Sequence, residues 1–176
     1  VHDALQYAAE GVAGDALRAA CRSRLIALDR PLRADGEPEE LDELLAVVEA
    51  VRSSPLWQRA EQSTQRLLEA PFAVRFTAGE YAAAAGPALE GVLHEIVEGR
   101  VDLAFREDDG WIIVDYKSDA AGEHIPQELM LRYRAQLVLY AAAWAKLTGE
   151  PVKETALLFT ATGGVARFPG SGLGGE

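Results

Sequence analysis

The chain has 176 residues, 49% of them hydrophobic, so it is long enough to bury the core of one globular domain. Its formal net charge of −11 argues against a broad basic surface for nucleic acid, and any polyanion must be held by local positive charge, a metal or another domain. The single cysteine, Cys21, excludes an internal disulfide and a four-cysteine zinc or iron–sulfur site.

Targeting and nucleotide-binding signals are not found in the sequence. No run has the length and apolar character of a transmembrane helix or a signal peptide, so we expect no membrane partner. The single cysteine fits a reducing cytoplasm, so we expect a cytoplasmic protein. The absence of a Walker A pattern predicts that this chain binds no nucleotide. The first residue is Val1 rather than methionine, which suggests a fragment excised from a longer protein.

The N-terminal part is predicted to be helical. Three stretches have the spacing of amphipathic helices: 1–28, 39–52 and 54 to about 70. His2 lies in the first turn of the first helix, and taken alone it is interpreted as a frayed surface residue. Glu69 closes the third helix, where its charge opposes the helix dipole; another group could hold it, or it could simply be exposed.

The middle of the chain is predicted to form strands. A strand covers 72–76, the alanine-rich stretch 79–91 is not assigned, and 92–97 leads into an alternating strand that begins at Arg100. His94 alternates with apolar neighbours, which favours a strand histidine over a metal ligand.

The stretch 99–119 predicts a β-hairpin with a turn at 107–110. With an even number of turn residues, Asp102 lies opposite Asp115, and Lys117 points to the same face. Two carboxylates at this spacing repel one another unless a divalent cation lies between them. The alternative is a solvated hairpin whose charges are incidental.

After a loop at 120–126, the chain is predicted to form a long helix over 127–148, ending at Gly149. One stripe of this helix is interpreted as core: Tyr133, Gln136, Leu137, Tyr140 and Trp144. Gln136 needs hydrogen-bonding partners if it is buried there. Strands are predicted over 155–161 and 165–168, and 169–176 is predicted to be disordered.

The expected fold is α/β, with a small mixed sheet flanked by helices. We predict one domain over 1–168, with a helical part at 1–70 and an α/β core at 71–168.

Three motifs together resemble the nuclease domain of RecB/AddA-type helicase–nucleases, within the PD-(D/E)XK superfamily. They are Gly99-Arg-Val-Asp102, Asp115-Tyr-Lys117-Ser-Asp119 and Tyr133-Arg-Ala-Gln136-Leu-Val-Leu-Tyr140. The resemblance is good from Phe72 to Phe168. Towards the N-terminus, His2 and Glu69 stand where the family has a histidine and a glutamate.

The resemblance implies a Mg²⁺- or Mn²⁺-dependent deoxyribonuclease of the exodeoxyribonuclease V type, without an iron–sulfur cluster. The implied metal ligands are the side chains of His2, Asp102 and Asp115 and the carbonyl oxygen of Tyr116, with Glu69 in the inner or outer shell. Lys117 would orient the attacking water and stabilise charge at the phosphate. Gln136 and Tyr140 would shape the site and contact DNA.

The implied partners are DNA, particularly single-stranded ends, the helicase motor domains of the same chain and a partner subunit, in double-strand break processing and recombinational repair. One alternative is a non-catalytic module of the same fold that binds or guides single-stranded DNA. Another is an unrelated interaction domain with an acidic hairpin, which would leave the pairing of Gln136 with Tyr140 unexplained.

Overall fold

The computed structural model describes residues 1–85, 94–118 and 126–170. They form a mixed sheet in the order β1-β2-β3-β4-β5, in which only β3 and β4 run parallel. The strands are β1 (Arg66–Thr77), β2 (His94–Glu107), β3 (Gly110–Lys117), β4 (Val152–Phe159) and β5 (Gly164–Pro169). The predicted α/β fold with a small mixed sheet is therefore confirmed.

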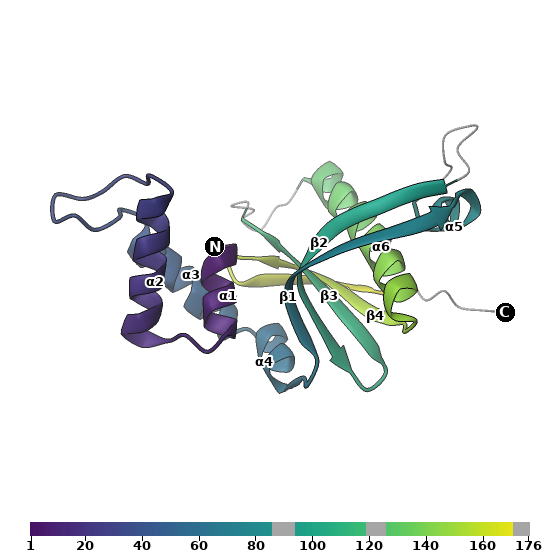
Figure 1. Ribbon diagram of the computed structural model, residues 1–176, viewed down its shortest axis with the longest axis horizontal. Coiled ribbons are helices and arrows are strands. Elements are labelled where there is room, and N and C mark those ends of the chain that lie inside the picture. Colours follow the sequence, from purple (N-terminus) through teal and green to yellow (C-terminus); the bar gives the residue numbers. More distant parts are fainter. Residues whose placement is uncertain (86–93, 119–125, 171–176) are drawn as a thin grey trace.

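Helices cover the two faces of the sheet at opposite ends of the molecule (Figure 1). The N-terminal group consists of α1 (His2–Ala9), α2 (Gly14–Ala27), α3 (Leu41–Arg52) and α4 (Pro55–Gln62). Its buried side chains, including Leu5, Leu41 and Trp57, form one core with part of β2 and β3. A second core lies under α5 (Ala78–Ala85) and α6 (Gln127–Thr148).

The prediction of one helix over 1–28 is wrong, because the chain turns between α1 and α2. Gly11 has a φ of +89° there and Gly14 a φ of +56°, values that glycine adopts at little cost. The break folds α2 back so that it contacts α1.

The third helix begins as predicted but ends early. Ser54 caps α4 by accepting a hydrogen bond from the Trp57 N–H at 3.2 Å, and the helix ends at Gln62. The Ser63 hydroxyl then donates to the Arg106 carbonyl at 2.7 Å, which ties the chain to the edge of β2. Strand pairing from Arg66 onward replaces the expected last two turns, so the prediction that Glu69 closes a helix is wrong.

The hairpin register is confirmed, although its turn is shorter than expected. Arg106 pairs with Trp111, Glu107 pairs with Gly110, and the turn consists of residues 108–109. The strands expected from Val92 and from Arg100 are one continuous strand, β2, in which His94 is a strand residue.

The predicted bounds of α6 are confirmed, and Gly149 ends the helix with a φ of +71°. The parts of the predictions that concern 86–93, 119–125 and 171–176 fall outside the described residues. No helix in the described part is long and apolar enough to cross a bilayer.

Candidate metal centre

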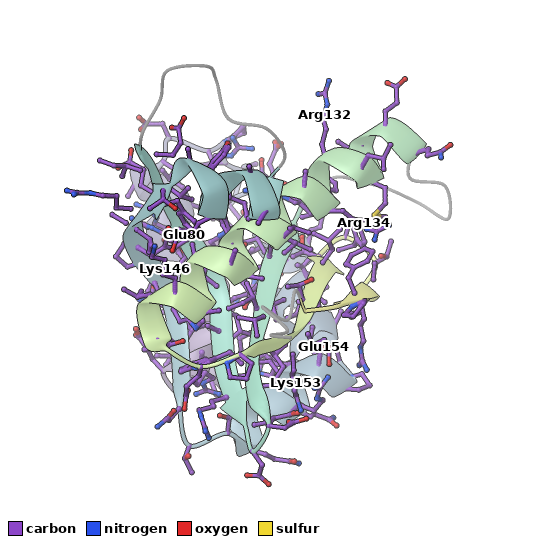
Figure 2. The ribbon with its side chains drawn as sticks, turned by 90° about the vertical axis from the view of Figure 1, so that its right-hand side faces the viewer. Glu80, Arg132, Arg134, Lys146, Lys153 and Glu154 are labelled. Carbon is purple, nitrogen blue, oxygen red and sulfur yellow. The ribbon has the colours of Figure 1, made fainter. Side chains whose placement is uncertain are left out.

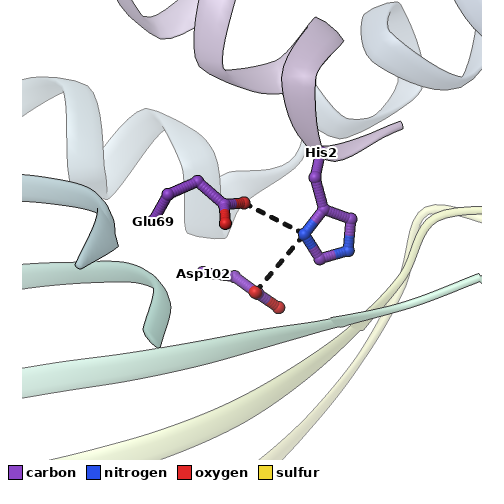
Figure 3. A group of neighbouring side chains, drawn as sticks. All are labelled: His2, Glu69 and Asp102. Atoms are coloured by element: carbon purple, nitrogen blue, oxygen red, sulfur yellow. Dashed lines mark hydrogen bonds and ion pairs between the residues drawn. The ribbon is translucent and has the colours of Figure 1, made fainter. Parts of the chain in front are cut away.

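Three side chains from different elements converge beside the N-terminal helices (Figure 3). The Nδ1 atom of His2, on α1, lies 3.0 Å from Glu69 Oε1 and 3.4 Å from Asp102 Oδ1. One ligand atom from each of the three residues lies within 4.8 Å of the other two. His2 is therefore held in a cluster with β1 and β2, and its interpretation as a frayed residue is wrong.

An irregularity in the β1–β2 ladder places the two acids of this cluster. Leu68 pairs with Leu103 and Ala70 pairs with Val101, while the intervening Glu69 has a left-handed φ of +48°. Residues two apart on a regular strand share a face. Here, however, Leu68 and Leu103 pack in the core of the N-terminal helices, whereas Ala70 and Val101 pack in the core under α6. Both strands thus switch faces at Glu69 and its partner position, Asp102.

Asp115 lies beside this cluster on β3. Continuing the ladder from Leu103 and Val114 places Asp102 opposite Asp115, although Asp115 is not among the three residues with mutually close ligand atoms. Burial raises the pKa of Asp115 against the opposing effect of Lys117, and the nearby Asp102 carboxylate raises it further. Asp115 is thus a carboxyl group whose charge the protein compensates only in part.

The ammonium group of Lys117 lies 2.6 Å from Asp115 Oδ2. The two are not aligned as a hydrogen bond, so Oδ2 is a buried oxygen without a hydrogen-bond partner among the described residues. Lys117 Nζ also donates to Gln136 Oε1 at 3.3 Å and lies 4.3 Å from the centre of the Tyr133 ring. The predicted Gln136 therefore reaches the site through Lys117.

Sequence reasoning missed two contacts of Lys117. Tyr133 was interpreted only as a core residue, although its ring is placed for a cation–π contact with the ammonium. The N–H of Thr160, at the carboxyl end of β4, donates to the Lys117 carbonyl at 2.9 Å. A polar residue directly after the apolar strand 156–159 was the available signal, since functional groups gather at the carboxyl ends of parallel strands.

The two predicted tyrosines occupy different places. The Tyr116 N–H donates to Asp102 Oδ2 at 2.6 Å, and its ring meets the His2 ring edge-on with 5.5 Å between centroids. Tyr140 packs instead over β1 and β2, where its ring meets that of Phe72 at 5.0 Å. A Cβ atom added at Gly99 would lie 2.6 Å from the Tyr140 hydroxyl oxygen, so the glycine makes room for this tyrosine. Tyr116 thus touches the cluster, whereas Tyr140 lies against the sheet.

Comparison with known proteins assigns the fold to a family. A family model described as the PD-(D/E)XK nuclease superfamily matches residues 1–169. The chain belongs to this superfamily. Membership agrees with the acidic cluster and with the lysine beside it.

Within the superfamily, the chain is similar to segments of bacterial proteins that are each named as one subunit of an ATP-dependent helicase/nuclease. The protein from Carboxydothermus hydrogenoformans is 37% identical over 138 residues, which are 73% of this chain and 12% of the relative. The one from Alkaliphilus oremlandii is 36% identical over 113 residues, which are 64% of this chain and 9% of the relative. The one from Syntrophomonas wolfei is 35% identical over 122 residues, which are 66% of this chain and 10% of the relative. The chain therefore spans about a tenth of the length of these relatives.

The cluster of His2, Glu69 and Asp102 has the chemistry of a divalent metal site. Its donors are one imidazole nitrogen and two carboxylate oxygens, and carboxylates suit hard cations such as Mg²⁺ and Mn²⁺. The hydrogen bond with Asp102 raises the pKa of His2, so the acids already favour a positive charge between them. The buried Asp115 carboxylate, whose Oδ2 lies 2.6 Å from the Lys117 ammonium, is a further oxygen donor beside the cluster. These residues fit a divalent cation.

Proposed function

We propose that this chain is a metal-dependent DNA nuclease domain that hydrolyses phosphodiester bonds with Mg²⁺ or Mn²⁺. The observation that carries the proposal is the convergence of His2, Glu69 and Asp102 beside the ion pair of the buried Asp115 with the partly buried Lys117. A structural ion pair would need Asp115 and Lys117 alone, and it would not need an imidazole between two carboxylates.

The residues divide into those that hold the cation and those that act on the phosphate. His2, Asp102, Asp115 and the Tyr116 carbonyl would hold the cation, with Glu69 as a direct or outer ligand. When bound, the cation lowers the pKa of a water molecule and offsets the charge that develops on the phosphate. Its ligands are fixed by contacts within the chain, such as the hydrogen bond from the Tyr116 N–H to Asp102.

Lys117 supplies a second positive charge beside the phosphate and orients the attacking water. Gln136 and Tyr133 hold its ammonium group, so the lysine is positioned before substrate arrives. Tyr140 lines the approach of the DNA strand along β1 and β2, where Gly99 accommodates its ring.

The relatives are named as subunits of an ATP-dependent helicase/nuclease, and we propose that this domain belongs to such a protein. We further propose that the protein is of the exodeoxyribonuclease V type and processes double-strand breaks for recombinational repair in the cytoplasm. The substrate would be single-stranded DNA ends delivered by motor domains of the same chain, together with a partner subunit. Delivery by a motor explains how a domain with a net charge of −11 can act on an anion.

The test is cleavage of linear single-stranded DNA by the chain with Mg²⁺ or Mn²⁺, compared with Asp115→Ala and Asp108→Ala. Asp108 is an exposed acid at the tip of the same hairpin, so its variant makes the same charge change away from the cluster. We expect Asp115→Ala to lose cleavage and Asp108→Ala to keep it. Cleavage that survives Asp115→Ala would refute the assignment. DNA binding without cleavage in the unsubstituted chain would favour a module that only guides the strand.

A further inference from the structure

Most of the positive charge of this chain is already neutralised by its own acids. Of the 17 lysines and arginines, twelve have a described carboxylate oxygen within 4.0 Å. The five without such a partner in the described part are Arg52, Arg66, Arg75, Arg132 and Arg134. Arg52 and Arg66 are half-buried, which leaves three exposed arginines without an acidic partner among the described residues.

The cations next to the candidate metal centre each lie beside one of its carboxylates. Lys117 lies 2.6 Å from Asp115, and the Arg100 guanidinium lies 3.6 Å from Glu69. A DNA strand that enters the centre therefore needs another positive group for the phosphates on either side of the bond being cut.

Arg132 is placed to supply that group. It lies one helical turn before Gln136 on α6, and Tyr140 follows one turn later in the same row. Gln136 contacts Lys117 and Tyr140 packs on β1 and β2, so the two later members of this row contact the centre and the strand pair beside it, while Arg132 is exposed at the outer end of the row. Four residues of helix advance about 6 Å, a distance that an arginine side chain spans easily.

We infer that Arg132 binds a backbone phosphate adjacent to the phosphate being cut, an inference that rests on the proposed nuclease function. Figure 2 shows its side chain extending outward from the first half of α6. The planar guanidinium can donate two parallel hydrogen bonds to one phosphate and remains charged at any working pH. Glu128, one turn earlier on the same helix, forms no ion pair with it, and neither does any other acid among the residues that the structure describes.

Arg134 provides a matched control on the same helix. It is also exposed and has no described acidic partner, but it points towards β5, where its guanidinium lies 5.1 Å from the centre of the Phe168 ring. Two residues along a helix correspond to more than half a turn, so Arg134 and Arg132 lie on different sides of α6. Arg75, on β1 six residues from Glu69, is a second control with an unpaired exposed charge in the described structure.

The experiment measures binding of a single-stranded oligonucleotide to the 176-residue chain across a range of NaCl concentrations, with a fixed excess of Ca²⁺ to limit cleavage. Removing one phosphate contact on a single strand should reduce the slope of log K against log salt by about 0.7. We expect this reduction for Arg132→Gln, with about 3- to 10-fold weaker binding at low salt. Arg134→Gln and Arg75→Gln should keep the slope of the unsubstituted chain.

Kinetics with Mn²⁺ provide the second measurement. Arg132→Gln should raise KM and leave kcat within about twofold, because the arginine contacts a phosphate that does not react. Equal slopes for Arg132→Gln and both controls, in a chain that binds and cuts DNA, would overturn this inference and leave the nuclease function standing. A chain that neither binds nor cuts DNA would overturn both. Melting temperatures of the three variants show whether each is folded.

Discussion

The backbone of Glu69 carries strain that substitution can measure. Its φ of +48° lies within a strand, and for a residue with a Cβ atom the left-handed conformation costs about 1–2 kcal/mol. Glycine avoids this cost but loses about 0.5–1 kcal/mol more conformational entropy on folding. Replacing Glu69 by alanine or by glycine removes the same contacts with His2 and Arg100, so the two variants differ chiefly in their backbone. We therefore expect Glu69→Gly to be more stable than Glu69→Ala by about 0.5–1 kcal/mol.

Urea and thermal unfolding in EDTA measure this difference. For a chain of 176 residues it corresponds to a melting temperature about 1–4 °C higher for the glycine variant. Ala73 is exposed on the same strand without a positive φ, so Ala73→Gly should instead lose about 0.5–1 kcal/mol. Glu69→Ala at least as stable as Glu69→Gly would refute a left-handed backbone at this position. Mn²⁺ should raise the melting temperature of both Glu69 variants equally, and by less than in the unsubstituted chain, since neither variant keeps the carboxylate.

Three further substitutions test the site and its surroundings. Burial raises the pKa of Asp115, so the ionised carboxylate destabilises the fold at pH values above that pKa. Asp115→Asn should therefore have a higher melting temperature than the unsubstituted chain in EDTA, and Mn²⁺ should raise its melting temperature less. A gain from Mn²⁺ equal to that of the unsubstituted chain would contradict a ligand role. Gly99→Ala should lower the free energy of unfolding in urea by about 1–3 kcal/mol, because the new methyl group would lie 2.6 Å from the Tyr140 hydroxyl. An unchanged free energy of unfolding would mean that Tyr140 moves freely. The hydrogen bonds from Arg59 are the largest cause that lowers the pKa of Glu107 to about 2, so this carboxylate stabilises the fold at neutral pH. For a partly exposed pair we expect Glu107→Gln to cost about 1 kcal/mol or less at pH 7, and the cost should shrink as the pH falls from 4.5 towards 2. A cost that does not change with pH would exclude the ion pair as its origin.

The parts of the site that follow from local periodicity were predictable. A strand alternates with a period of two, so alternation alone placed Lys117 on the same side of β3 as Asp115, and an even turn gave the register in which Arg106 pairs with Trp111. The bounds of α6 followed from its helical spacing and from Gly149, whose left-handed φ ends the helix. Whether Asp102 and Asp115 share one cation stays a prediction.

The parts that depend on contacts distant in sequence were not predictable in the same way. The segment 63–70 has helical composition, yet its pairing with β2 forms a strand, and a single sequence does not show which of the two wins. The same pairing brings Glu69 and His2 together across 67 residues of chain. For Tyr133, the apolar stripe on α6 correctly indicated a helix face near the core, but the contact with Lys117 depends on how β3 passes under the helix.

The position of the acidic cluster follows from the two cores of the fold. One core needs β1 and β2 to present side chains to the N-terminal helices, and the other needs the same strands to present side chains to α5 and α6. The strands can serve both only if they switch faces once along their length, and the switch occurs at Glu69 and Asp102. At that point the ladder leaves room for polar side chains between two apolar regions, and His2 approaches from α1. Changes that favour a regular ladder at this point should therefore stabilise the sheet and weaken the cluster, because the irregular backbone and the convergence of the acids have the same cause.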